Sequence, residues 1–186
     1  VAKGNTSIDI DFLKKQKEYL IIDAYNVINN WPELIEIRDN LEHARDKLIG
    51  LMLEYGAYKG YQVFVVFDAP YTAEKENIQQ LSSFLTVIFT QEDETADSYI
   101  EKLAYDSVKL GEKVFVVTSD WVEQMVILGA GAYRISSREL RKDVRKAKKV
   151  IEEEYSINSK LNRNELGGII SSAVADKLEI IRRGKK

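Results

Sequence analysis

The sequence contains no cysteine, a single histidine and no apolar run close to the length of a membrane span. Without cysteine the chain can form no disulfide and no thiolate metal site, which suits a reducing, cytoplasmic compartment. A bilayer span needs about 20 consecutive apolar residues, and a signal peptide needs an apolar core that the first residues lack. We therefore expect a cytoplasmic protein that has no membrane partner.

The chain also lacks a glycine-rich phosphate loop. Kinases and nucleoside triphosphatases hold their phosphates with such a loop, so these classes are excluded and no nucleotide cofactor is expected.

Charge is unevenly distributed along the chain, whose net charge is −3. Residues 1–100 carry 9 basic and 17 acidic side chains, whereas residues 101–186 carry 18 basic and 13 acidic ones. An acidic part that could hold a metal ion and a basic part that could hold phosphate suit an enzyme that acts on nucleic acid.

Three runs of β-branched and aromatic residues each lead into an aspartate. Such near-continuous apolar runs are typical of strands that are covered on both faces, as in a parallel sheet. The runs and their acids are Tyr19–Ile22 with Asp23, Val63–Phe67 with Asp68, and Val114–Val117 with Asp120, which follows Thr118 and Ser119. The carboxyl ends of parallel strands lie along one edge, where open α/β folds bind ligands, so we expect these acids to converge.

Convergence of the acids predicts a divalent metal site. Two carboxylates about 4 Å apart repel each other by roughly 4 kcal/mol at an effective dielectric constant near 20, and a cation among them removes this cost. Asn26, three residues after Asp23, could orient a metal-bound water or the carboxylate itself. The other interpretation is that Asp23, Asn26 and Asp68 only form the turns after their strands.

A fourth acidic group, Glu94-Thr95-Ala96-Asp97, lies where a strand is followed by a helix. Asp97 is the candidate ligand of this group, and Glu94 and Glu101 are further candidates, since Glu101 follows Asp97 by one turn on the same face. Alternatively, Asp97 only stabilises the first helical turn through the helix dipole.

Strands alternate with helices between residues 19 and 150. Further strands are predicted at Phe84–Phe89 and Tyr133–Ile135, and helices at Leu41–Tyr58, Ala96–Leu110 and Trp121–Leu128. Another helix begins at a capping box formed by Ser136 and Glu139. The alternation implies right-handed crossovers and a doubly wound α/β sheet.

The two ends of the chain fall outside this alternation. We expect an arm at residues 1–18, one domain at residues 19–150 and a C-terminal helical and basic extension at residues 151–186. Within the extension, Leu161–Ile181 is predicted as a further helix, interrupted at Gly167 and Gly168.

Four short blocks resemble the signature blocks of the NYN domain family, a branch of the PIN-like nucleases, and most closely its YacP-like bacterial subfamily. The blocks are Ile22–Asn26, Val66–Ala69, Glu94–Asp97 and Val117–Asp120. The match extends into Ser119–Gln124, Gly129–Ala132 and Ser137–Leu140, and it covers residues 19–150.

The resemblance implies a Rossmann-like, three-layer fold with a mostly parallel central sheet. It also implies endonucleolytic cleavage of single-stranded RNA, and in this subfamily a cleavage of mRNA that depends on the ribosome. RNA and the ribosome are thus the expected partners, and Mg²⁺ or Mn²⁺ the expected cofactor. The metal ligands that it implies are Asp23, Asp68, Asp97 and Asp120, with Asn26 in support.

Metal at this edge would lower the pKa of a bound water and stabilise the charge that develops on a phosphate. With two metals, in-line attack by water would leave a 5′-phosphate and a 3′-hydroxyl. The single histidine, His43, is expected on the surface of a helix beside Arg45, so a ribonuclease mechanism that uses two histidines is excluded.

A basic helix is the candidate surface for phosphate contacts, because eight basic and two acidic side chains lie between Arg134 and Lys149. The residues assigned to RNA binding are Arg138, Arg141, Lys142, Arg145 and Lys149. The other interpretation is a helix face that is only solvated. Four aromatic residues near the acidic edge could stack on unpaired bases, namely Tyr25, Trp31, Tyr71 and Trp121.

Two other functions need residues that the sequence does not have at the required positions. A phosphatase of the haloacid type needs a second aspartate where Tyr25 stands, and a metal-dependent adhesion module needs serines at Tyr25 and Val27. The alternative that stays open is a non-catalytic RNA- or ribosome-binding module that retains the PIN-like fold.

Overall fold

The computed structural model describes residues 17–68, 77–91, 93–119, 129 and 131–169, the last twelve of them by their backbone alone. The chain divides into two compact units, Val1–Arg145 and Lys146–Lys186. The first unit holds the sheet and the helices around it. In the second unit the described residues continue a helix that starts in the first.

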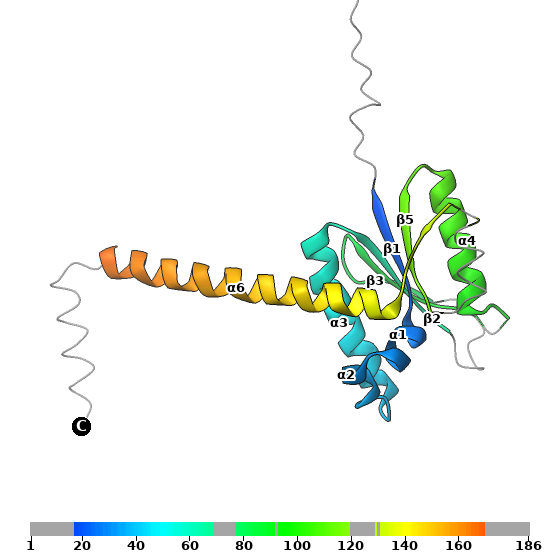
Figure 1. The fold of residues 1–186 in the computed structure, drawn as a ribbon, viewed down its shortest axis with the longest axis horizontal. Coiled ribbons are helices and arrows are strands. Elements are labelled where there is room, and N and C mark those ends of the chain that lie inside the picture. The colour runs from blue at the N-terminus through cyan, green and yellow to red at the C-terminus, as the bar shows by residue number, and fades with distance from the viewer. Residues whose placement is uncertain (1–16, 69–76, 92, 120–128, 130, 170–186) are drawn as a thin grey trace, which may run out of the picture. The chain divides into compact units, whose positions relative to one another are not determined.

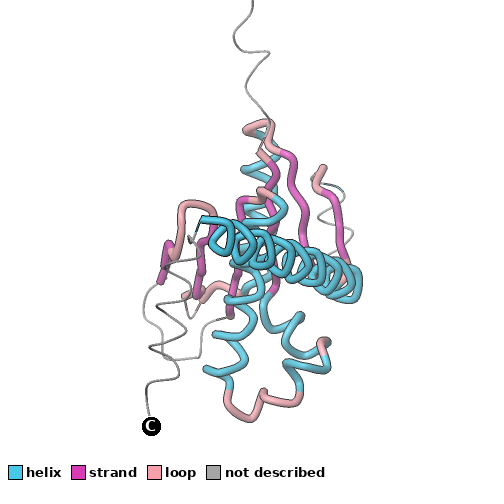
Figure 2. The backbone as a smooth tube through the Cα atoms, turned by 90° about the vertical axis from the view of Figure 1, so that its left-hand side faces the viewer, coloured by secondary structure: helices cyan, strands magenta, loops and turns pink. Residues whose placement is uncertain are grey.

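Six strands form one sheet in the first unit (Figure 1), and Figure 2 draws them as neighbouring magenta segments. They are β1 (Glu18–Asp23), β2 (Gln62–Phe67), β3 (Asn77–Gln80), β4 (Leu85–Phe89), β5 (Lys113–Val117) and β6 (Tyr133–Ile135). Their order is β3-β4-β2-β1-β5-β6, and every pair is parallel except β3 with β4. The prediction of a Rossmann-like α/β fold with a mostly parallel sheet is confirmed.

The described helices connect and flank these strands. They are α1 (Ala24–Asn30), α2 (Pro32–Ile35), α3 (Leu41–Lys59), α4 (Ala96–Lys109) and α6 (Ser137–Ile169). The helix predicted at residues 121–128 lies outside the described residues. In the described part of the chain, no helix combines the length and the apolarity that crossing a bilayer requires.

Helices cover both faces of the sheet because the chain reverses direction across it. From β1 the chain passes through α3 to β2 on one side, whereas from β4 it passes through α4 to β5 on the other side of β1. Right-handed crossovers in opposite directions place their helices on opposite faces. On the α4 face, Ile21, Val66 and Val116 of the sheet pack with Ile100 and other buried residues of the helix.

Two short helices replace the turn that was predicted after the first strand. Asp23 caps α1, since its Oδ1 accepts a hydrogen bond from the backbone N–H of Asn26 at 3.0 Å. The N–H of Trp31 then bonds to the carbonyl of Val27 and ends the helix, and Pro32 starts α2. An aspartate that ends a strand thus starts a helix directly, as N-cap residues do.

β3 was not predicted, because residues 69–81 show no apolar alternation. All four residues of β3 are exposed, and the strand pairs only with β4, with Ile78 opposite Ile88. An edge strand with two solvated faces carries no hydrophobic period.

The prediction of a separate helix at Leu161–Ile181 is wrong for the residues that the structure describes. α6 starts at Ser137, after the predicted capping box, and continues through Gly167 and Gly168 to Ile169. Each glycine costs about 1 kcal/mol relative to alanine, which weakens a helix but does not by itself end it.

Candidate active site

Four strands end at the edge of the sheet that carries the predicted acids. The strand register sets Asp23 opposite Val66 of β2, and Ile22 opposite Val117 of β5. Across this edge, the residues that end or follow β4, β2, β1 and β5 are Thr90, Asp68, Asp23 and Thr118 in that order. The acids that are far apart in sequence therefore meet at the edge because the strands are parallel.

Asp23 is the half-buried centre of the edge. Its pKa is raised from 3.8 to about 6, chiefly by burial and to a smaller extent by the nearby carboxylates of Asp97 and Asp68, against hydrogen bonds from the backbone of Asn26 and Tyr25. Burial of the carboxyl is thus the main cause of the shift, and the negative charges of Asp97 and Asp68 add to it.

Asp68 joins the end of β2 to the start of α4. Its Oδ1 accepts a hydrogen bond from the backbone N–H of Ala96 at 3.0 Å and one from Thr90 Oγ1 at 3.4 Å. Thr95 caps the helix through the N–H of Ser98 at 3.2 Å, and Asp97 follows in the first turn with an exposed side chain. Asp68 thereby fixes the start of α4, which carries Asp97, to the end of β2.

The remaining predicted acids are placed differently. Asp120 lies outside the described residues, while Glu94 is half-buried and Glu101 is exposed on α4. Within the described ranges, no three His, Cys, Asp or Glu side chains are gathered closely enough to hold a metal ion. The chemistry of Asp23, Asp68 and Asp97, though not their spacing here, suits Mg²⁺ or Mn²⁺, because these hard ions prefer carboxylate oxygens.

Arg45 of α3 packs beside the same edge, on the face of the sheet opposite to α4. No sequence motif indicates a role for it. Its guanidinium carbon lies 5.4 Å from the ring centre of Tyr25, and 5.7 Å from those of Phe67 and Phe89. Its Nε also donates a hydrogen bond to the Tyr25 hydroxyl at 2.9 Å. The only signal in the sequence for this role of Arg45 is a charged residue beside the apolar stripe of α3. The three aromatic partners of Arg45 come from different elements, so no local pattern links them to it.

Two of the aromatic residues predicted to stack on bases are used inside the protein. Trp31 is 1% exposed, and its indole Nε1 donates a hydrogen bond to the carbonyl of Ser137 at 2.8 Å, so the prediction for Trp31 is wrong. Tyr25 is half-buried between Arg45 and Phe67. Tyr71 and Trp121 lie outside the described residues.

A polar cavity of about 480 Å³ lies between the edge and the start of α6. It is lined by Asn30, Pro32, Ser119, Ser136, Arg138 and Arg141. Arg141 is held by Glu33, with Nη2 at 2.7 Å and Nε at 2.9 Å from Oε2, and this hydrogen bonding raises its pKa. Ser119 lies two residues after the end of β5, so the cavity borders the edge that carries Asp23.

The other basic residues assigned to RNA extend along α6. Lys142 and Arg145 are exposed in the first unit. Lys149 is exposed in the second unit, where its Nζ lies 4.0 Å from a carboxylate oxygen of Glu153, one turn further on. Two of the five predicted basic residues, Arg138 and Arg141, thus line the cavity beside the acidic edge.

Comparison with known proteins gives consistent results. Residues 20–183 match a family model described as a YacP-like NYN domain. The chain is 44% identical over 136 residues to the uncharacterized protein YacP of Bacillus subtilis strain 168, covering 73% of this chain and 79% of that one.

Two crystal structures of Rae1 (YacP) from Bacillus subtilis are similar to the described fold. One superposes with a TM-score of 0.66 at 39% identity and covers 89% of this chain and 95% of that chain. The other, of a mutant, has a TM-score of 0.64 at 37% identity and covers 86% and 89% of the two chains.

Proposed function

Because the chain belongs to the YacP-like NYN domain family, we propose that it is a metal-dependent endoribonuclease that cleaves single-stranded RNA. Family membership supports a nuclease-type function related to RNA. The observation that carries the finer proposal is that Asp23 and Asp68 lie at the ends of neighbouring parallel strands, with Asp97 in the first turn of the helix whose start Asp68 binds.

The edge supplies the residues that hold the metal. Asp23, Asp68 and Asp97 contribute carboxylate oxygens, and Asp120 is proposed as a further ligand from its place in the sequence. Bound Mg²⁺ or Mn²⁺ supplies the acidity of a coordinated water and a positive charge for the phosphate. Asp23 is oriented for this role by its hydrogen bond from the N–H of Asn26.

The protein itself positions the RNA backbone. Arg138 and Arg141 line the cavity beside the edge, and Arg141 is fixed there by Glu33. Guanidinium groups bind phosphate oxygens through paired N–H donors, and a side chain that is already ordered loses less freedom on binding. Cleavage by water then breaks the bond between phosphorus and the 3′-oxygen and leaves a 5′-phosphate and a 3′-hydroxyl.

We further propose that the substrate is mRNA on the ribosome, in the cytoplasm. This proposal is supported by the resemblance of the motif blocks at Asp23, Asp68 and Asp97 to the YacP-like subfamily. Exposed Lys142 and Arg145 provide a basic surface of the kind that contacts RNA phosphates.

The second candidate function is a non-catalytic RNA- or ribosome-binding module. It is favoured by the spacing of the acids in the described residues, which are not gathered closely enough to ligate a metal together. In that case the basic residues would bind RNA, and the acids would only cap α1 and α4.

A cleavage assay separates the two functions. Single-stranded RNA and ribosome-bound mRNA are incubated with the protein in millimolar Mn²⁺ or in EDTA. We expect cleavage only with Mn²⁺ and none with Asp23→Asn, whereas Asp46→Asn, an exposed acid on α3, retains the rate of the wild type. RNA binding without cleavage under every condition would support the binding module instead.

A further inference from the structure

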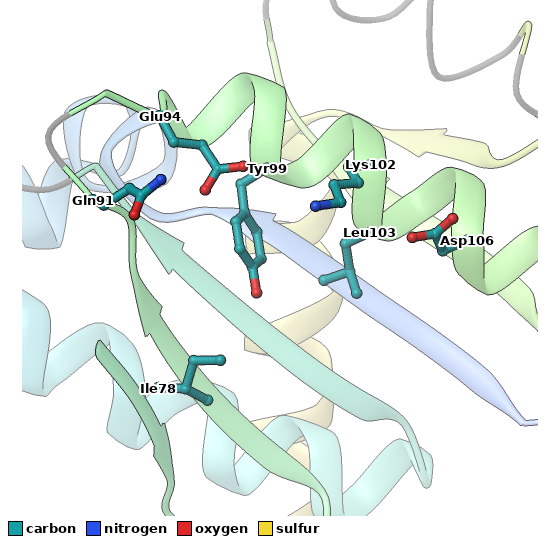
Figure 3. A pocket seen from close by; sticks show the side chains of 7 residues that line it. All are labelled: Ile78, Gln91, Glu94, Tyr99, Lys102, Leu103 and Asp106. Atoms are coloured by element: carbon teal, nitrogen blue, oxygen red, sulfur yellow. The ribbon is translucent and has the colours of Figure 1, made fainter. Parts of the chain in front are cut away.

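A second groove, of about 380 Å³, lies on the opposite side of the acidic edge from the basic cavity. It is lined by Ile78, Gln91, Glu94, Tyr99, Lys102, Leu103 and Asp106, and Figure 3 shows these side chains between α4 and the strands β3 and β4. Its volume falls in the range of small-molecule sites, about 300–1,000 Å³.

One face of α4 forms a wall of this groove. Tyr99, Lys102, Leu103 and Asp106 follow each other at the three- and four-residue spacing that places side chains on the same side of a helix. Tyr99 and Leu103 are half-buried and pack against the core under α4, so the wall is firmly supported. Ile78 of the edge strand β3 lines the groove while remaining 56% exposed.

The groove begins in the loop that holds the acidic edge together. Gln91 follows Thr90, whose hydroxyl donates to Asp68, and Glu94 lies two residues before Ala96, whose N–H donates to the same carboxylate. In Figure 3, Gln91 and Glu94 lie at one end of the groove, and Asp106 lies at the other end, along α4. The end with Gln91 and Glu94 therefore adjoins the proposed site of phosphate cleavage.

Charge decides which part of a nucleotide fits here. Glu94 and Asp106 carry two negative charges against the one positive charge of Lys102, so a phosphate is disfavoured by like charge. A base has a flat apolar face that stacks on an aromatic ring such as Tyr99, and polar edges that need partners.

We propose that this groove binds an unpaired guanine next to the cleaved phosphate, with Glu94 as the residue that selects it. An ionised carboxylate only accepts hydrogen bonds, and it accepts two at once from neighbouring donors. Guanine presents such a pair, N1–H and the N2 amino group. On the corresponding edge, adenine, cytosine and uracil each present an acceptor next to a donor, and a carboxylate repels that acceptor. This proposal depends on RNA being the substrate, as stated above.

The test measures binding without cleavage. Short oligouridylates that carry one guanine, inosine or adenine at the centre are titrated in EDTA with the full chain, and binding is followed by fluorescence anisotropy. A well-formed bidentate contact discriminates bases by about 1–3 kcal/mol, which is about 5- to 150-fold in affinity, and an exposed groove favours the lower part of this range. We expect guanine to bind about tenfold more tightly than adenine, and inosine, which lacks the N2 amino group, to lie between them.

Two substitutions then locate the preference. Glu94→Gln should reduce the ratio between guanine and adenine to less than about twofold, because an amide presents only one acceptor. Glu54→Gln, the same change at an exposed position of α3, should leave the ratio unchanged. Equal binding of guanine and adenine, or a preference that survives Glu94→Gln, would overturn the assignment of the groove and leave the proposed nuclease intact. Absence of any RNA binding by the wild type would overturn both proposals.

Discussion

Replacing Asp23 with asparagine should stabilise the protein when no metal is bound. Asn caps a helix as well as Asp does, so the hydrogen bond from the N–H of Asn26 should persist while the charge disappears. The pKa of Asp23 is raised from 3.8 to about 6, and this shift of roughly two units corresponds to about 3 kcal/mol. We take about 2 kcal/mol as the expected gain, since solvent screens a half-buried carboxyl.

The sign of the effect determines its pH dependence. A group whose folded pKa is raised binds its proton more tightly in the folded state, so its contribution is favourable at low pH and is lost as the pH rises. The free energies of unfolding of wild type and Asp23→Asn should nearly coincide at pH 4. They should diverge between about pH 4 and pH 6, where the unfolded state has released the proton that the folded state still holds, and run parallel above about pH 7.

The assay is a thermal melt in EDTA between pH 4 and 8. For a chain of this length, about 2 kcal/mol corresponds to a rise in Tm of roughly 4–8 °C. Millimolar Mn²⁺ should then raise the Tm of wild type more than that of Asp23→Asn, because binding to the folded state alone adds stability. As a control, Asp46→Asn should change neither the Tm nor its pH dependence. A lower Tm for Asp23→Asn at pH 7.5 in EDTA would refute the raised pKa of Asp23 and the cost of burying its charge.

Three further outcomes follow from the structure. Asp97→Asn should abolish RNA cleavage in Mn²⁺ and leave the circular dichroism spectrum unchanged; wild-type rates in a preparation free of other nucleases would remove Asp97 from the site. Reversing the charges of Arg138, Lys142 and Arg145 to Glu should weaken RNA binding and reduce the slope of log K against log salt by about 0.7 for each lost phosphate contact; an unchanged slope would mean that this face is only solvated. Trp31→Phe should lower the free energy of unfolding by about 1–3 kcal/mol in urea, because the buried carbonyl of Ser137 loses its donor, and an unchanged urea midpoint would contradict this.

Local patterns in the sequence were sufficient for most of the scaffold. The strands β2 and β5 are predictable because their positions 63–67 and 114–117 are all apolar, as expected where both faces of a strand are covered. The helix α3 is predictable because its stripe of buried residues recurs every three to four positions and Gly60, with a φ of 74°, ends it. β3 has no such signal, since all four of its residues are exposed and none of them needs to be apolar.

The sequence by itself also determined which acids end which strands, because a parallel sheet sends all its carboxyl ends to one edge. Only the tertiary structure decided what each acid does there: Asp23 caps α1, and Asp68 binds the start of the helix α4 that carries Asp97. The contacts of Trp31 and Arg141 also depend on the tertiary structure, because their partners Ser137 and Glu33 lie more than 100 residues away in the chain. Contacts over such separations depend on how the elements pack, and no local period in the sequence encodes them.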